Sequence, residues 1–138
     1  MSRDYNIRWT WLRIMYIYTI VGAGVFGLCV LLIPDVLKSL LGWPTQDPIV
    51  LGIFGSVGVA FGLLSILGLR SPLKFVPILL LELCYKTIWF VAVILPLLIA
   101  GQCPLYAIFY KVVFATYIIG DLIAIPFPYV FAKEGPAA

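Results

Sequence analysis

The sequence predicts an all-α fold, a four-helix bundle that spans a membrane as one domain over residues 1–138. The first observation is its composition: 64% of the residues are hydrophobic and 11% are charged, whereas a soluble domain carries roughly a quarter charged residues. The second is a set of four long apolar stretches. A soluble globular domain and a disordered chain are therefore excluded, and the lipid bilayer is the first expected partner.

Each apolar stretch is long enough for the ~20 helical residues that cross a hydrocarbon core. The first two contain no charged residue, the third contains Glu82 and Lys86, and the fourth contains Lys111 and Asp121. Continuous apolar runs of this kind favour helices, which satisfy their own backbone hydrogen bonds in lipid. The predicted spans are approximately 12–33, 49–69, 76–100 and 105–128.

The connections between these spans carry clear breaking signals. Pro34 ends the first span, and residues 35–41 share an apolar face that predicts a short interfacial helix, which ends at Gly42. Turn-rich connectors are expected at 43–48, 70–74 and 101–104. Pro126 and Pro128 are expected to end the fourth helix.

The distribution of cations predicts the orientation. With four spans, both termini and the second loop share one side, and the opposite loops hold only Lys38. The positive-inside rule then places both termini in the cytoplasm. An outer aromatic belt is expected at Trp43, Tyr106 and Tyr110. The cations on the cytoplasmic side are Arg3, Arg8, Arg13, Arg70, Lys74 and Lys133.

Small residues on the first two helices predict close helix packing. Gly58 and Gly62 on the second helix have the small-x-x-x-small spacing, and Ala23 and Gly27 repeat it on the first. Two interpretations follow: these residues pack the first hairpin together, or they form an interface with a second copy or another membrane subunit.

Three ionisable residues form the candidate site. Glu82 and Lys86 occupy i and i+4 on one helix, in the order that favours an ion pair, and antiparallel packing brings Asp121 to the same depth. Charges inside a bilayer are costly and rare, so each one needs a reason. Lys111 lies nearer its helix end and is expected to reach the interface with its charged tip.

Five further residues are expected at comparable depth as hydrogen-bonding or packing neighbours. Fully ionised, the cluster carries one net negative charge, so one carboxyl holds a proton, or Arg13 reaches in, or water enters. The cluster is then a buried ion-pair network that fixes helix register, a functional site for a proton, head group or ligand, or a set of lipid-facing charges. The expected neighbours are Tyr16, Thr19, Ser65, Tyr117 and Trp89.

The sequence predicts no catalytic residue, no metal ligand set and no cofactor. Histidine is absent, which excludes imidazole metal sites and Ser-His or Cys-His nucleophile pairs. Cys29, Cys84 and Cys103 form no Cys-x-x-Cys motif. The cations lie at helix ends, so the net charge of +3 does not indicate nucleic-acid binding. An enzymatic role stays open, and a non-enzymatic one is favoured.

Two segments resemble a known group of proteins: Leu-Lys-Ser-Leu-Leu-Gly-Trp-Pro at 37–44, before the glycine-rich helix, and Leu-Glu-Leu-Cys-Tyr-Lys-Thr-Ile-Trp at 81–89. Together they look like small bacterial four-helix membrane proteins of the broad DoxX-like type. The resemblance implies a four-helix bundle in the bacterial inner (cytoplasmic) membrane. Some members of that group are associated with thiosulfate or quinone-linked redox chemistry, but the resemblance transfers no catalytic residue to this chain.

Three functions fit these observations. The first is a non-enzymatic subunit or scaffold that packs against other membrane proteins or copies of itself. The second is an oligomeric proton-linked transporter or channel that uses Glu82, Lys86 and Asp121. The third is a quinone- or lipid-binding redox accessory protein, whose electron carrier would lie on a partner.

Overall fold

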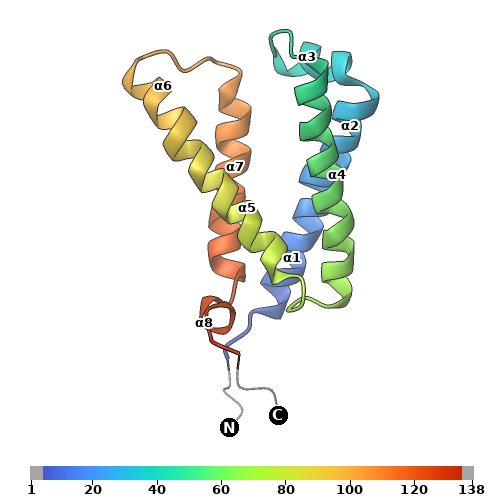
Figure 1. Cartoon of the computed structure of the whole chain (residues 1–138), viewed down its shortest axis with the longest axis vertical. Coiled ribbons are helices and arrows are strands. Elements are labelled where there is room, and N and C mark those ends of the chain that lie inside the picture. Colours follow the sequence, from blue (N-terminus) through green and yellow to red (C-terminus); the bar gives the residue numbers. More distant parts are fainter. Residues whose placement is uncertain (1–4, 135–138) are drawn as a thin grey trace.

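The computed structural model describes residues 5–134, which are helical and contain no strand (Figure 1). The prediction of an all-helical fold is confirmed for this range, and four of its helices are long and apolar enough to cross a membrane. Arg3 lies outside the described residues. Many large apolar side chains point outward, Leu32 and Ile99 among them with exposed fractions of 75% and 80%. An apolar exterior of this extent fits contact with lipid.

The four long helices are built from eight helical segments. The first consists of α1 (Trp9–Thr19), a π-helical turn η1 (Ile20–Val25) and α2 (Phe26–Leu32). The second is α4 (Pro48–Arg70). The third consists of α5 (Val76–Trp89), a π-helical turn η2 (Phe90–Ile94) and α6 (Leu95–Ile99), and the fourth is α7 (Ala107–Ala124). The turn η2 ends two residues before Pro96, which has no backbone N–H to donate the regular hydrogen bond of an α-helix.

The fourth helix is shorter than the predicted range 105–128. It begins at Ala107 and ends at Ala124, because Ile125 is extended (φ −69°, ψ 123°). A residue that precedes a proline disfavours the α conformation, and Ile125 precedes Pro126. The chain then forms a single further turn, α8 (Phe127–Val130).

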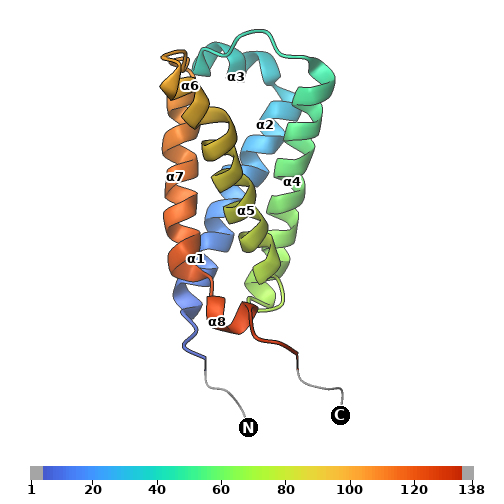
Figure 2. The same cartoon turned by 60° about the vertical axis from the view of Figure 1, so that its left-hand side comes forward.

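A short helix, α3 (Pro34–Leu41), occupies the place predicted for an interfacial helix at 35–41. It crosses the end of the molecule opposite α8 (Figure 2). Gly42 ends it in the left-handed conformation, with φ +67°. The amide of Gly42 donates to the carbonyl of Lys38, as in the usual glycine helix end.

The N-terminus of α4 is capped by Asp47. One carboxylate oxygen of Asp47 accepts from the amides of Ile49 (2.8 Å) and Val50 (3.0 Å). We expect Asp47→Ala to lower the stability of the protein by about 1 kcal/mol, because two helix amides lose their partner. Asp47→Asn is the matched control and should cost a few tenths at most. Thermal unfolding of both variants in detergent measures the difference, and equal losses would contradict the capping role.

Glycines hold the first long helix against α4. A Cβ added to Gly27 would lie 2.6 Å from the carbonyl oxygen of Gly55, and one added to Gly58 would lie 2.7 Å from that of Ala23. A Cβ added to Gly62 would lie 2.6 Å from Cα of Gly24. The small residues predicted for packing are therefore used inside the chain, where they hold the first hairpin together.

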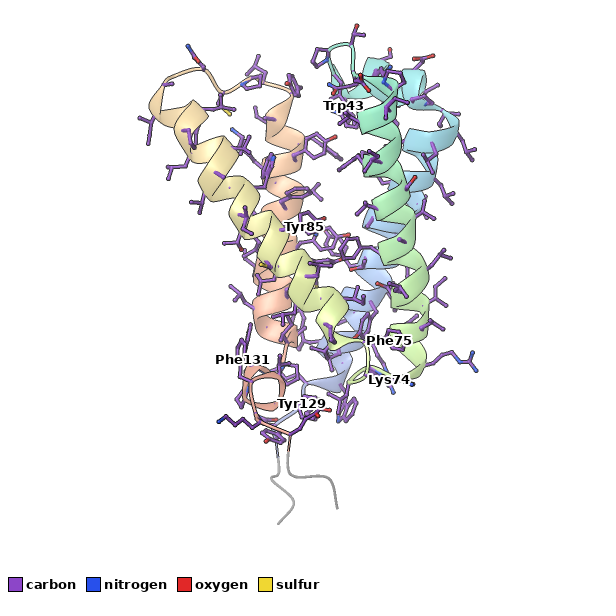
Figure 3. All side chains as sticks on the ribbon, in the orientation of Figure 1. Trp43, Lys74, Phe75, Tyr85, Tyr129 and Phe131 are labelled. Atoms are coloured by element: carbon purple, nitrogen blue, oxygen red, sulfur yellow. The ribbon has the colours of Figure 1, made fainter. Side chains whose placement is uncertain are left out.

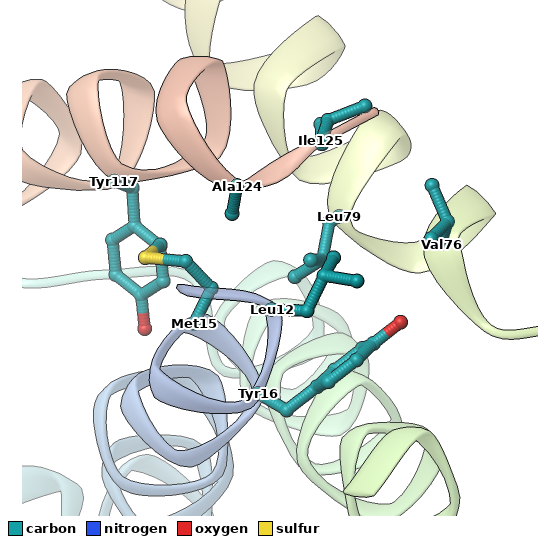
Figure 4. Packing of buried hydrophobic residues seen from close by; sticks show 8 residues of the cluster. All are labelled: Leu12, Met15, Tyr16, Val76, Leu79, Tyr117, Ala124 and Ile125. Atoms are coloured by element: carbon teal, nitrogen blue, oxygen red, sulfur yellow. The ribbon is translucent and has the colours of Figure 1, made fainter. Parts of the chain in front are cut away.

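The second hairpin is formed by α5 and α7, and α7 also packs against α1. The two hairpins converge toward α8 and separate toward α3 (Figure 1). A buried apolar cluster fills the convergent end (Figure 4). Tyr5 stacks edge-on against Tyr129 there, so both ends of the described chain lie on one side. The cluster consists of Leu12, Met15, Tyr16, Val76, Leu79, Tyr117, Ala124 and Ile125.

Candidate functional site: a buried polar cluster below an aromatic cavity

Five polar side chains are buried between the four long helices, all with exposed fractions of 0–1%. Every long helix contributes at least one of them, and α5 contributes two. The charged members therefore face the protein interior and do not reach into lipid. The five residues are Thr19 on α1, Ser65 on α4, Glu82 and Lys86 on α5, and Asp121 on α7.

Thr19 joins the first hairpin to the second. Its hydroxyl lies 2.8 Å from the carbonyl oxygen of Met15 and 3.1 Å from Oε2 of Glu82. A threonine hydroxyl carries one proton, which is shared between these two acceptors. Glu82 is thus held at the junction of the hairpins by α1, as expected of a hydrogen-bonding neighbour.

The ion pair favoured by the spacing of Glu82 and Lys86 does not form. Among residues 5–134, the structure shows an ion pair within 4 Å only between Lys38 and Asp35, at 3.6 Å. Oε1 of Glu82 and both carboxylate oxygens of Asp121 have no hydrogen-bond partner. Arg13 is exposed and does not compensate them. The interpretation of the cluster as a closed ion-pair network is therefore not supported.

Lys86 instead lies among aromatic rings. Its Nζ is 4.1 Å from the ring centre of Tyr117, 4.3 Å from that of Tyr85 and 5.3 Å from that of Phe114. The negative faces of such rings attract an ammonium group. These rings come from α5 and α7, so the ammonium group of Lys86 is held on the second hairpin. Lys86 also lines a cavity that is described below.

Tyr16 and Trp89 contact groups outside the charged cluster, whereas Tyr117 packs its ring against Lys86 and directs only its hydroxyl elsewhere. The hydroxyl of Tyr16 donates to the carbonyl of Pro72 (2.6 Å), and that of Tyr117 donates to the carbonyl of Tyr18 (3.1 Å). Trp89 packs against aromatic rings, its ring centre lying 5.0 Å from that of Phe114. Ser65 is buried and its hydroxyl has no partner. Thr19 alone of the five therefore has a hydrogen bond to a member of the charged cluster in the described structure.

Two adjoining cavities of about 480 Å³ and 380 Å³ lie between the separated parts of the hairpins. They share four aromatic side chains: Phe54, Tyr85, Tyr110 and Phe114. Lys86 lines the smaller cavity and is the only charged residue on the walls of the two among the described residues. The larger cavity is lined mainly by apolar and aromatic residues, as is usual for sites that bind small molecules.

Trp43 closes the larger cavity near α3. It stacks on Tyr110, with ring centres 5.4 Å apart, and its indole N–H has no hydrogen-bond partner. Trp43 and Tyr85 lie in the space between the hairpins (Figure 3). Trp43, Tyr106 and Tyr110, for which an outer aromatic belt is predicted, all line this cavity.

Sequence reasoning missed this cavity, although a signal for it was present. Tyr110, Phe114 and Tyr117 recur at helical spacing on α7, and Tyr85 and Trp89 do so on α5. Two aromatic faces on neighbouring helices indicate a shared aromatic wall. The sequence cannot indicate whether side chains of the first hairpin fill the space beside this wall or leave a cavity there.

The described residues contain no group of three or more His, Cys, Asp or Glu side chains that could hold a metal ion. The described site consists of an ammonium group that faces an aromatic cavity, with two buried carboxyl groups behind it. Comparison of the chain with protein-family models, with curated proteins and with solved structures found no match.

Proposed function

We propose that the protein binds a small quinone-type molecule inside the membrane, in the aromatic cavity between its hairpins. The observation that carries this proposal is the position of Lys86, which lines the smaller cavity and is the only charged side chain on the walls of the two adjoining cavities among residues 5–134. An ammonium group donates hydrogen bonds and accepts none. A ligand that fits must therefore combine a largely apolar body with an acceptor oxygen directed toward Lys86.

A quinone meets each of these requirements. Its flat ring can stack on aromatic side chains such as Phe114 and Tyr110, and its carbonyl oxygens accept hydrogen bonds. The unpaired indole N–H of Trp43 supplies a second donor in the larger cavity, which adjoins the smaller cavity that Lys86 lines. A phospholipid head group fits less well, because burying a phosphate beside a 1% exposed lysine in an apolar interior carries a large desolvation cost.

The proposed location is the bacterial inner membrane, with both termini in the cytoplasm. Arg8, Lys74 and Lys133 lie at the end of the molecule that carries the chain termini, which the positive-inside rule favours for the cytoplasmic face. The cavity then faces the outer leaflet, near α3. The DoxX-like resemblance agrees with this proposal, since some members of that group are associated with quinone-linked chemistry.

In this proposal the chain is a binding subunit, and electron transfer to or from the quinone involves a partner protein. Such a partner would pack on the lipid-facing surfaces of the helices. The glycine faces of the first hairpin are not available for it, because Gly27, Gly58 and Gly62 already contact the neighbouring helix of the same chain.

The test uses the fluorescence of Trp43 and Trp89, both of which line the larger cavity. Titrating decylubiquinone into the protein in lipid nanodiscs should quench this fluorescence saturably. Lys86→Met should weaken binding by about tenfold or more, because a hydrogen bond to a charged donor contributes about 1.5–3 kcal/mol.

Lys111→Met is the matched control, since it removes a lysine charge from the same membrane region but does not line either cavity. It should bind as the wild type does. Quenching that rises linearly with quinone concentration, and equally in all three proteins, would show simple partitioning of quinone into the lipid and would contradict the proposal.

A further inference from the structure

Behind the aromatic cavity, four buried side-chain oxygen atoms have no hydrogen-bond partner in the described structure: Oε1 of Glu82, both carboxylate oxygens of Asp121 and Oγ of Ser65. We propose that they form, with the hydroxyl of Thr19, a binding site for one small monovalent cation of the Na⁺ type. This site is separate from the quinone cavity, and the proposal for it does not depend on the proposed ligand.

The unpartnered atoms are the first argument. Oε1 of Glu82, both oxygens of Asp121 and Oγ of Ser65 are fully buried and unpaired. Buried polar atoms almost always have partners, because leaving them unpaired costs free energy. The nearby protein donors are committed elsewhere, since the hydroxyl of Tyr16 donates to Pro72, that of Tyr117 to Tyr18, and the Lys86 ammonium lies over aromatic rings.

The helix contacts bring Ser65 to the same level as Thr19. Gly62 on α4 lies against Gly24 on the first long helix, and Gly68 lies against the ring of Tyr16. Ser65 is halfway between these two glycines and shares their helical face, since residues at i, i+3 and i+6 line one side. Ser65 is therefore on the face of α4 toward α1, near the level of Thr19, which contacts Glu82.

Charge balance selects the valence of the ion. The titratable groups that surround the site are Tyr16 from α1; Glu82, Tyr85 and Lys86 from α5; and Tyr117 and Asp121 from α7, while α4 contributes only Ser65. Two carboxylates and one ammonium leave a single negative charge, which one monovalent cation neutralises. A divalent ion would leave a positive charge in a low-dielectric interior, which is costly.

The donor set agrees with this choice. Carboxylate and hydroxyl oxygens are hard ligands that suit alkali and alkaline-earth cations and do not suit softer transition metals. The Lys86 ammonium, held on the aromatic rings, leaves the carboxylate oxygens free for such an ion.

The experiment is thermal unfolding of the purified full chain in detergent at pH 8, with NaCl replacing choline chloride at constant ionic strength. The wild type should gain several degrees in Tm, and the gain should saturate, since a ligand that binds only the folded state stabilises it. MgCl₂ should give no comparable gain. Asp121→Asn should abolish the Na⁺ effect, whereas Asp35→Asn, which changes an exposed aspartate on α3, should keep it.

Lys86→Met supplies an independent readout. Removing the neighbouring positive charge should lower the Na⁺ concentration at half effect by about tenfold or more, because like charges repel strongly in a low-dielectric interior. If Asp121→Asn does not fold, the wild type and Lys86→Met decide the question. A wild-type Tm that is the same in Na⁺ and choline⁺ would overturn the proposal. If that Tm then varies with pH alone, the cluster binds protons and no metal cation. Persistence of the Na⁺ effect in a folded Asp121→Asn protein would equally overturn it.

Discussion

Replacing Gly27 with alanine is expected to destabilise the protein by about 3 kcal/mol, the upper part of the range for overpacking a tight interface. The added Cβ would lie 2.6 Å from the carbonyl oxygen of Gly55 and 2.8 Å from the amide nitrogen of Val59. Both are backbone atoms of α4, so no side-chain rotation can make room. The first long helix and α4 must move apart, and contacts along the whole hairpin weaken with them.

Gly52→Ala is the matched control for this variant. Gly52 lies on α4 as well, but a Cβ added there meets no atom within 4 Å. We expect its free energy of unfolding to stay within about 0.5 kcal/mol of the wild type. Unfolding in mixed micelles of increasing SDS content measures both variants. Similar losses for Gly27→Ala and Gly52→Ala would show that these two helices do not pack through their glycine face.

The features that depend on local chemistry could be predicted from the sequence. Four apolar runs predicted four long helices because lipid leaves the backbone few alternatives. Gly42 and Pro34 marked the limits of α3 through their backbone preferences, and the small-residue spacing of Gly58 and Gly62 predicted a close helix approach. The fourth helix ends four residues before the predicted residue 128, because Pro126 disfavours the α conformation of Ile125.

The candidate site could be predicted only in part. Burial of Glu82, Lys86 and Asp121 follows from the cost of charge in lipid, and the antiparallel hairpin placed them at one depth. The direction of the Lys86 side chain could not be predicted, because Glu82 and the aromatic rings compete for the same ammonium group. The cavity also could not be predicted. It lies where the two hairpins separate, and Phe54 of the first hairpin and Tyr110 of the second contact each other in its wall. That separation depends on the packing of four helices together.

The charge balance of the site leads to the second large effect. Lys86→Met is expected to destabilise the protein by about 3 kcal/mol in Na⁺-free buffer, because removing one member of a buried charge group leaves the others uncompensated. Methionine keeps most of the apolar stem that packs on Tyr85 and Tyr117, so the loss reports mainly on the charge. Lys111→Met, on the partly exposed surface of α7, should stay within about 0.5 kcal/mol of the wild type.

Combining Lys86→Met with Asp121→Asn separates charge compensation from aromatic stacking. If Lys86 stabilises the fold by balancing the carboxylates, the double variant should recover most of the loss, because it again carries one negative charge. Asp121→Asn alone should then cost less than Lys86→Met alone, since it leaves Glu82 and Lys86 with no net charge. If the ammonium stabilises the fold only through the rings of Tyr85 and Tyr117, the two substitutions should simply add. A double-mutant cycle measured by SDS unfolding distinguishes these cases, and strict additivity would rule out charge compensation at this site.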